Sequence, residues 1–169
     1  MSIITGLVKK GDITILYLLN RRIHCNWLNV FMRAVTQLGS TGFSVLLPLI
    51  LMLTAKQGIK TMGAEIGSTL ILGQIIVQLL KRLVNRPRPY NILKDIVAKK
   101  PPACKYSFPS GHTCAAFSIA FQIAANIPSL AVVLILIASM VAVSRIYLGF
   151  HYPSDVAVGV IIAYISYLI

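Results

Sequence analysis

The sequence predicts an all-α fold, a polytopic helical bundle that crosses a membrane. Hydrophobic residues make up 57% of the 169 residues, and the mean hydropathy of +0.80 sets the chain apart from soluble proteins. Five apolar runs follow one another, each close to the ~20 residues that cross a hydrocarbon core. They lie at residues 40–55, 62–80, 113–127, 128–143 and 153–169. We therefore expect about five transmembrane helices in a single domain of residues 1–169.

Residues 1–39 show a different pattern. The apolar stretch at residues 13–19 is too short to span a membrane and is followed by Arg21 and Arg22. Between Trp27 and Leu38, apolar residues recur at helical spacing and polar residues lie between them. Amphipathic helices of this kind lie along a membrane surface. We expect residues 1–39 to form an interfacial N-terminal segment.

Short breaks separate the apolar runs that follow. Lys56 and Lys60 lie between the first two runs. The last three runs are divided only by residues 126–129 and 149–153, which contain proline and glycine and are typical of turns. Such tight breaks predict helical hairpins, so that consecutive spans run antiparallel.

The net charge of the chain indicates which class of molecule it binds. The formal net charge is +12, which in a soluble protein would suggest nucleic acid. Here the basic residues lie beside membrane-length runs, so anionic lipid head groups are the expected partner and nucleic acid is not. Cys25, Cys104 and Cys114 have neither the spacing of a metal site nor that of a disulfide framework, although a Cys104–Cys114 bridge stays open. We expect no metal and no cofactor.

Three short clusters contain most of the reactive side chains. They are KRLVNRPRP at residues 81–89, PSGH at 109–112 and SRIYLGFHYPSD at 144–155. The two runs between the second and third clusters lead away from one membrane face and back to it. Counting spans therefore puts all three clusters on the same face. Fixed cations next to histidines are suited to binding and transferring a phosphoryl group.

Each cluster also has a simpler interpretation. His151 and Asp155 are four residues apart at a helix start, so the carboxylate can accept a proton from one imidazole nitrogen and leave the other as a nucleophile. Asp155 could instead only cap that helix. His112 follows Ser110 and Gly111 at another helix start, where amides can bind an anion, but a single histidine there is often structural. Basic residues such as those of the first cluster commonly lie at a membrane edge.

Taken together, the clusters resemble the signature of the type 2 phosphatidic acid phosphatase superfamily. The elements that match are Lys81, Arg88 and Pro89, then Pro109, Ser110, Gly111 and His112, then Ser144, Arg145, His151 and Asp155, all at the family's spacing. The resemblance covers residues 81–155. It implies a helical bundle that hydrolyses phosphomonoesters or diphosphates without a metal.

The resemblance also implies a role for each matching residue. His151 is expected to be the nucleophile that forms a phosphohistidine, oriented by Asp155. His112 is expected to protonate the leaving oxygen and then to activate water. The phosphoryl oxygens would be held by Lys81, Arg88, Arg145, Ser110 and Gly111.

From this we expect a multi-pass lipid phosphate phosphatase of the cell membrane. Its substrate would be a polyprenyl (undecaprenyl-type) diphosphate, phosphatidylglycerophosphate or phosphatidic acid. Two alternatives remain, namely an enzyme of the same superfamily with a soluble substrate, such as a vanadate-dependent haloperoxidase, and a non-enzymatic transporter or lipid-binding subunit that holds an anion.

Two arguments predict opposite membrane faces for the site. By the predicted span count, only Lys56 and Lys60 of the sixteen Lys and Arg lie on the face away from the clusters. The positive-inside rule then predicts a cytoplasmic site. The resemblance points the other way, because family members that act on bacterial lipids commonly face outward.

Overall fold

The computed structural model describes residues 2–23, 25–54, 56–98 and 104–169, and of residues 2–9 it describes the backbone alone. The described chain is helical and contains no strand, which confirms the predicted all-α bundle. Its α-helices are α1 (Ser2–Tyr17), α2 (Asn26–Val35), α3 (Thr41–Met52), α4 (Gln57–Val84), α5 (Pro89–Ile92), α6 (Gly111–Asn126), α7 (Ala131–Tyr147) and α8 (Pro153–Leu168). Shorter helical turns are η1 (Leu18–Arg22), η2 (Thr36–Gly39) and η3 (Pro128–Leu130).

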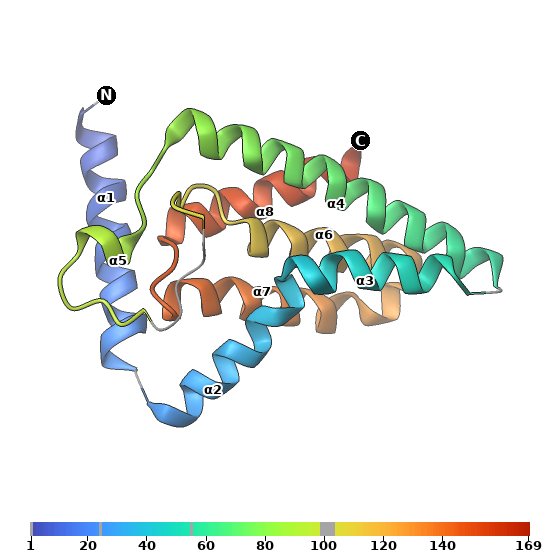
Figure 1. The fold of residues 1–169 in the computed structure, drawn as a ribbon, viewed down its shortest axis with the longest axis horizontal. Coiled ribbons are helices and arrows are strands. Elements are labelled where there is room, and N and C mark those ends of the chain that lie inside the picture. Colours follow the sequence, from blue (N-terminus) through green and yellow to red (C-terminus); the bar gives the residue numbers. More distant parts are fainter. Residues whose placement is uncertain (1, 24, 55, 99–103) are drawn as a thin grey trace.

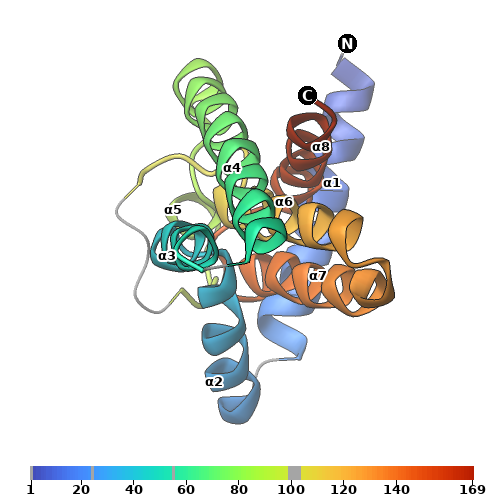
Figure 2. The same ribbon diagram turned by 90° about the vertical axis from the view of Figure 1, so that its right-hand side faces the viewer.

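Helix α6 forms the centre of the bundle, and α4, α7 and α8 pack around it (Figures 1 and 2). All eight residues at positions 113–120 of α6 are buried. Small residues allow the close approach. A Cβ added to Gly73 of α4 would lie 2.9 Å from the sulfur of Cys114, and one added to Gly159 of α8 would lie 2.8 Å from the carbonyl oxygen of Ser110.

The helices differ in their capacity to cross a membrane. Among the described residues, α4 and the helical segment Pro128–Tyr147 are long and apolar enough by themselves. The predicted span at residues 40–55 is shorter than expected, because α3 has only 12 residues, a length of about 18 Å. It reaches spanning length only together with α2 and η2, to which it is joined at a bend of 50°. Helices α6 and α8 have 16 residues each, so the number of five spans stays a prediction.

The N-terminal segment packs against one end of the bundle. Helix α1 lies across that end, roughly perpendicular to α4, α6 and α7 (Figure 1). Its Leu16 is fully buried. Asn20 of η1 is also buried and donates hydrogen bonds to the carbonyl oxygens of Val97, at 3.0 Å, and Tyr147, at 2.7 Å. The described residues of the segment 1–39 therefore form part of the folded bundle, and the expected place of this segment at the membrane surface stays a prediction.

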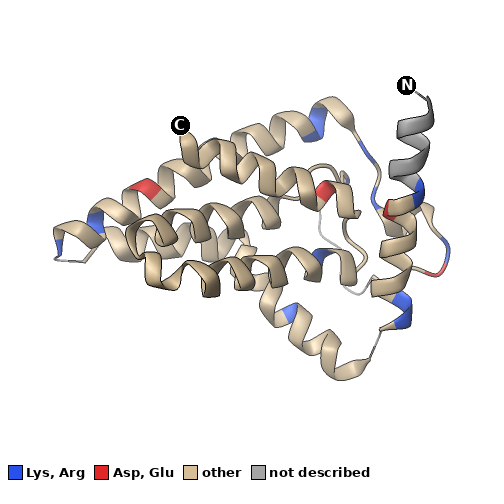
Figure 3. Ribbon diagram, turned by 180° about the vertical axis from the view of Figure 1, so that it is seen from behind, with Lys and Arg blue, Asp and Glu red and all other residues tan. Residues whose placement is uncertain are grey.

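The charged positions gather at the two ends of the bundle (Figure 3). Among the described residues, one small group of basic positions lies at the start of α4. Most of the others lie at the opposite end, where α1 crosses the bundle (Figure 3). The long helices between these ends carry few charges, which is the distribution expected where a hydrocarbon layer surrounds them.

At the bend between α2 and α3, Gly39 packs closely against the backbone of His112 and the side chain of Val141. A Cβ at this position would lie 2.5 Å from the carbonyl oxygen of His112 and 2.9 Å from a methyl group of Val141. We expect Gly39→Ala to lower the free energy of unfolding by about 1–3 kcal/mol, because backbone would have to move. Thermal unfolding in detergent measures this. Gly42→Ala is the control, since a Cβ there meets nothing within 4 Å, and equal unfolding temperatures of the two variants would contradict the assignment.

Candidate active site

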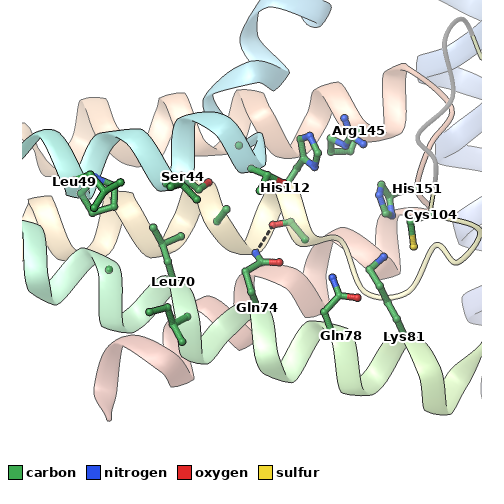
Figure 4. Close-up of a pocket in the computed structure, with 18 of the residues that line it drawn as sticks. Ser44, Leu49, Leu70, Gln74, Gln78, Lys81, Cys104, His112, Arg145 and His151 are labelled. Atoms are coloured by element: carbon green, nitrogen blue, oxygen red, sulfur yellow. Dashed lines mark hydrogen bonds between the residues drawn. The ribbon is translucent and has the colours of Figure 1, made fainter.

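One cavity is lined by residues from all three clusters. It has a volume of about 610 Å³ and lies between α3, α4 and the start of α6 (Figure 4). One end of its wall is charged, and the other end is formed by apolar side chains of α3 and α4. Six of the eight predicted site residues line it: Lys81, Arg88, Gly111, His112, Arg145 and His151.

Three buried cations define the charged end. Lys81 lies in the last turn of α4, Arg88 directly precedes α5, and Arg145 lies in the last turn of α7. Their exposed fractions are 6%, 3% and 3%. The left-handed Asn85 ends α4, and the prolines after it keep the chain extended, so that Arg88 turns back toward Lys81.

These cations are held by neutral oxygen atoms. Lys81 donates to the carbonyl oxygen of Tyr106 at 3.2 Å, and Arg145 donates to the hydroxyl of Thr36 at 2.8 Å. Arg88 donates to the carbonyl oxygens of Cys104 and Phe150. None of the three forms an ion pair with a described carboxylate, and the buried Nε of Arg145 has no hydrogen-bond partner among the described residues. Uncompensated buried cations favour an anion in the cavity.

His151 lies in the turn between α7 and α8. Gly149 has a φ of +73°, a conformation that strains other residues, and the turn closes where the amide of His151 donates to the carbonyl oxygen of Arg145 at 3.2 Å. The side chain is 2% exposed. Burial lowers the pKa of His151 well below its ordinary value, and the charges of Arg145, Arg88 and Lys81 lower it further. The imidazole is therefore neutral near pH 7.

The neighbours of His151 define its tautomer. Nε2 lies 3.3 Å from an Nη of Arg88, and a guanidinium can only donate. Nε2 is then the acceptor with a lone pair, and Nδ1 carries the proton. Nδ1 points to Asp155, whose Oδ2 is 3.6 Å away, a distance beyond that of a good hydrogen bond. The structure thus brings the predicted pair together without a close bond between them.

Asp155 is fully buried behind the cavity wall. Its Oδ2 accepts the amide of Tyr152 at 2.9 Å, which caps the first turn of α8. Its Oδ1 accepts from Arg86 at 2.6 Å. The capping role that the sequence left open is therefore present, and the same carboxylate also faces His151.

The PSGH cluster divides between the cavity and the helix behind it. His112 and Gly111 line the cavity at the start of α6. Ser110 does not, because it is fully buried and its hydroxyl accepts from the amide and the hydroxyl of Thr113 at 3.4 and 2.9 Å. The hydroxyl of Ser110 thus caps α6 outside the cavity wall, and its expected contact with phosphate stays a prediction.

Sequence reasoning missed two residues that act on the site. Arg86 lies between Asp155 and Asp12, with Nη–O distances of 2.6 and 2.8 Å. Burial lowers the pKa of Arg86, but the charges and hydrogen bonds of Asp155 and Asp12 outweigh burial and raise the pKa above its ordinary value. The sequence contained a feature that could have drawn attention to each of these two residues. Arg86 lies inside the first cluster, and Asp12 is one of only four acidic residues.

The sequence of this chain is similar to those of known lipid phosphatases. The family model of the PAP2 superfamily matches residues 63–169. Phosphatidylglycerophosphatase B of Bacillus subtilis is 32% identical, over 79% of this chain and 68% of its own length. Undecaprenyl-diphosphatase of Sulfolobus acidocaldarius is 32% identical, over 62% of this chain and 53% of its own length. The chain spans about half the length of several of the curated relatives that it matches.

Two solved structures share the fold. The crystal structure of Aquifex aeolicus LpxE superposes with a TM-score of 0.80 at 29% identity, covering 93% of this chain and 92% of that one. A transmembrane PAP2-type phosphatidylglycerolphosphate phosphatase from Bacillus subtilis superposes with a TM-score of 0.74 at 25% identity, covering 98% and 87%. The similarity thus extends beyond the matched motifs to the N-terminal helices.

Cys104 offers a test of the anion site, because it lines the cavity beside His151 (Figure 4). Burial raises the pKa of this thiol, but its hydrogen bond with the Tyr106 backbone and the charges of Lys81 and Arg88 lower the pKa overall, which favours the reactive thiolate. We expect inorganic phosphate to slow alkylation of Cys104 by N-ethylmaleimide, because bound phosphate would cover the thiol and neutralise the cations.

Mass spectrometry of the alkylated peptides gives the rate at each cysteine. Cys25 is exposed and outside the cavity, so it is the internal control. Its rate should be the same in phosphate and in chloride of equal ionic strength. Slowing of both cysteines, or of neither, would contradict an anion site between Lys81 and Arg88.

Proposed function

The chain belongs to the PAP2 superfamily, and from this we propose that it is a membrane lipid phosphate phosphatase. It would hydrolyse a phosphomonoester or diphosphate of a lipid through a phosphohistidine. The proposal includes a multi-pass arrangement in the cell membrane and a reaction that needs no metal ion.

The division of the cavity into a charged end and an apolar arm carries this proposal. Beyond Gln78 and Gln74, the wall that leads away from the cations is formed by Val45, Pro48, Leu49, Met52, Leu70 and Ile71. A lipid phosphate has the same division, an anionic head joined to an apolar chain. A small soluble phosphate ester would leave the arm without an occupant. The composition of the wall therefore favours a lipid over the soluble substrates that the sequence left open.

The first chemical step transfers the phosphoryl group to His151. Lys81, Arg88 and Arg145 would hold the phosphoryl oxygens and neutralise the charge that spreads over them in the transition state. Nε2 of His151 attacks phosphorus as the bond from phosphorus to the lipid oxygen breaks. Burial and the neighbouring cations lower the pKa of His112 to about 2, so the proton that it donates to that oxygen would enter with the bound phosphate, whose negative charge offsets those cations. The lipid then leaves as an alcohol or, from a diphosphate, as a monophosphate. Nδ1–H faces Asp155, whose negative charge stabilises the positive imidazole that forms.

The second step hydrolyses the phosphohistidine. His112, now neutral, takes a proton from water, and the water oxygen attacks phosphorus. The bond between phosphorus and Nε2 breaks, inorganic phosphate leaves, and both histidines return to their starting forms. Among the described residues, no three His, Cys, Asp or Glu side chains are grouped as metal ligands. Three fixed cations would supply the charge that a metal ion supplies in other phosphoryl transfers.

The names of the relatives suggest which lipids to compare. Those relatives are named for undecaprenyl diphosphate, phosphatidylglycerophosphate and lipid A 1-phosphate. We propose a polyprenyl diphosphate, phosphatidylglycerophosphate or phosphatidic acid as the substrate of this chain. All of them have one terminal phosphoryl group and long apolar chains, which suits a single group of cations beside an apolar arm.

A substrate panel in detergent tests the proposed class. We expect phosphate release from at least one of these lipids, with a kcat/KM at least about tenfold above that for glycerol phosphate, because the apolar arm contributes only to lipid binding. The assay contains excess EDTA. Equal rates for lipid and soluble esters would remove the argument from the cavity, and activity that is lost in EDTA and restored by Mg²⁺ would remove the metal-free mechanism.

The histidines can be distinguished with p-nitrophenyl phosphate, whose leaving group needs no proton. His151→Ala should form no acid-labile phosphoenzyme and should lose roughly a thousandfold or more in turnover. His112→Ala is the matched variant. It should still form the phosphoenzyme and should accumulate it, because activation of water is impaired. Phosphoenzyme formation by His151→Ala would show that another residue is the nucleophile.

A further inference from the structure

Arg86 is the centre of a polar network outside the cavity. One Nη donates to Asp155, at 2.6 Å, and to the hydroxyl of Ser154, at 2.7 Å, while the other donates to Asp12, at 2.8 Å. The guanidinium also lies over the ring of Tyr152, 3.9 Å from its centroid. A single planar cation thus joins α1, the loop after α4 and the first turn of α8.

Asp12 is the distal member of this network. It lies on α1, is 4% exposed, and is fully engaged. Its Oδ1 accepts the amide of Ser154 at 2.8 Å, and its Oδ2 accepts the hydroxyl of Ser154 at 2.6 Å besides Arg86. Ser154 is the second residue of α8, where free amides and the helix dipole favour a carboxylate. Asp12 therefore caps α8 from another helix.

Helix α8 begins at Pro153, two residues after His151, and Asp155 lies in its first turn. The position of the Asp155 carboxylate relative to His151 depends on the Tyr152 amide that Oδ2 accepts, and also on the direction in which α8 starts and on the partner of Oδ1. Asp12 acts on the last two, through Ser154 on the helix start and through Arg86 on Oδ1. The 3.6 Å separation of Asp155 from Nδ1 of His151 is the distance that these contacts control.

We propose that Asp12 is a positioning residue for catalysis, which acts through Arg86 and Ser154 to hold Asp155 in line with His151. The inference rests on the proposed phosphatase function. It gives the N-terminal helix a part in the reaction although none of the described side chains of α1 lines the cavity. Asp12 would not contact the substrate, so the phosphate cations would be unaffected by its loss.

The competing explanation is that Asp12 only fastens α1 to the bundle. In that case its substitution reduces the fraction of folded protein, and the molecules that stay folded turn over normally. If Asp12 positions Asp155, folded molecules bind phosphate normally but turn over slowly. The number of anion-binding sites per chain therefore has to be measured separately from the turnover rate per site.

The test uses Asp12→Asn, which keeps the shape and removes the charge. Titration calorimetry with vanadate in detergent gives the number of anion sites per chain and their Kd, and the lipid assay gives KM and kcat per site. We expect kcat per site to fall about 10–100-fold, with KM and the vanadate Kd unchanged within about twofold. Asp12→Glu should recover part of the loss. Asp95→Asn is the matched control, because its ion pair with Arg21 is exposed, and it should behave as the wild type.

A lower number of sites with an unchanged kcat per site would overturn the proposal in favour of simple anchoring, and so would wild-type behaviour of Asp12→Asn. If Asp12→Asn does not fold, Arg86→Lys makes the same test. Lysine keeps the charge but cannot bind both carboxylates in the planar fork of arginine, so the same loss of kcat per site is expected and a normal rate overturns the proposal. A wild type without lipid phosphatase activity would refute the proposed function itself.

Discussion

Three cations are buried at the charged end of the cavity, and none of them forms an ion pair with a described carboxylate. Burying positive charge in this way is costly unless other groups solvate it. Backbone carbonyl oxygens accept hydrogen bonds from Lys81 and Arg88, and the hydroxyl of Thr36 accepts one from Arg145. Neutral acceptors hold the cations in place without cancelling their charge, so the charge remains directed into the cavity.

The two buried acids near this site are kept away from the three cations by Arg86. Asp155 and Asp12 both bind its guanidinium. If either carboxylate turned to Lys81 or Arg88 instead, it would neutralise the region that a phosphate has to occupy. Arg86 thus satisfies the acids locally, and His151 lies between the acidic network and the cations. That position explains why one ring nitrogen faces a carboxylate and the other faces Arg88.

Close helix packing allows segments distant in the sequence to form this arrangement. Gly73 and Gly159 let α4 and α8 approach α6 so closely that a methyl group would not fit at either position. One cavity is then lined by the cations at the ends of α4 and α7 and by the histidine at the start of α6. Helix α3 packs against α4, and apolar side chains of both helices form the arm of the cavity.

The sequence by itself determined the helical class and the meeting of the three clusters. Both depend on local properties, since apolar runs of spanning length make helices and short turns make them antiparallel. From these alone, Lys81, His112 and His151 could be expected on one face, and the structure lines one cavity with them. The resemblance also assigned a role to each of these residues.

Tertiary structure alone decided how each polar group is used. The cap that Ser110 forms at the start of α6, with the hydroxyl of Thr113 donating to its oxygen, is one example. The sequence left the partners of Arg86 open, because they come from positions 74 and 69 residues away. The sequence separated α2 from α3 near residue 39, but the 50° bend between them depends on how both helices pack. Hydrogen bonds and close contacts between distant segments have no period in the sequence, so only the packed chain determines them.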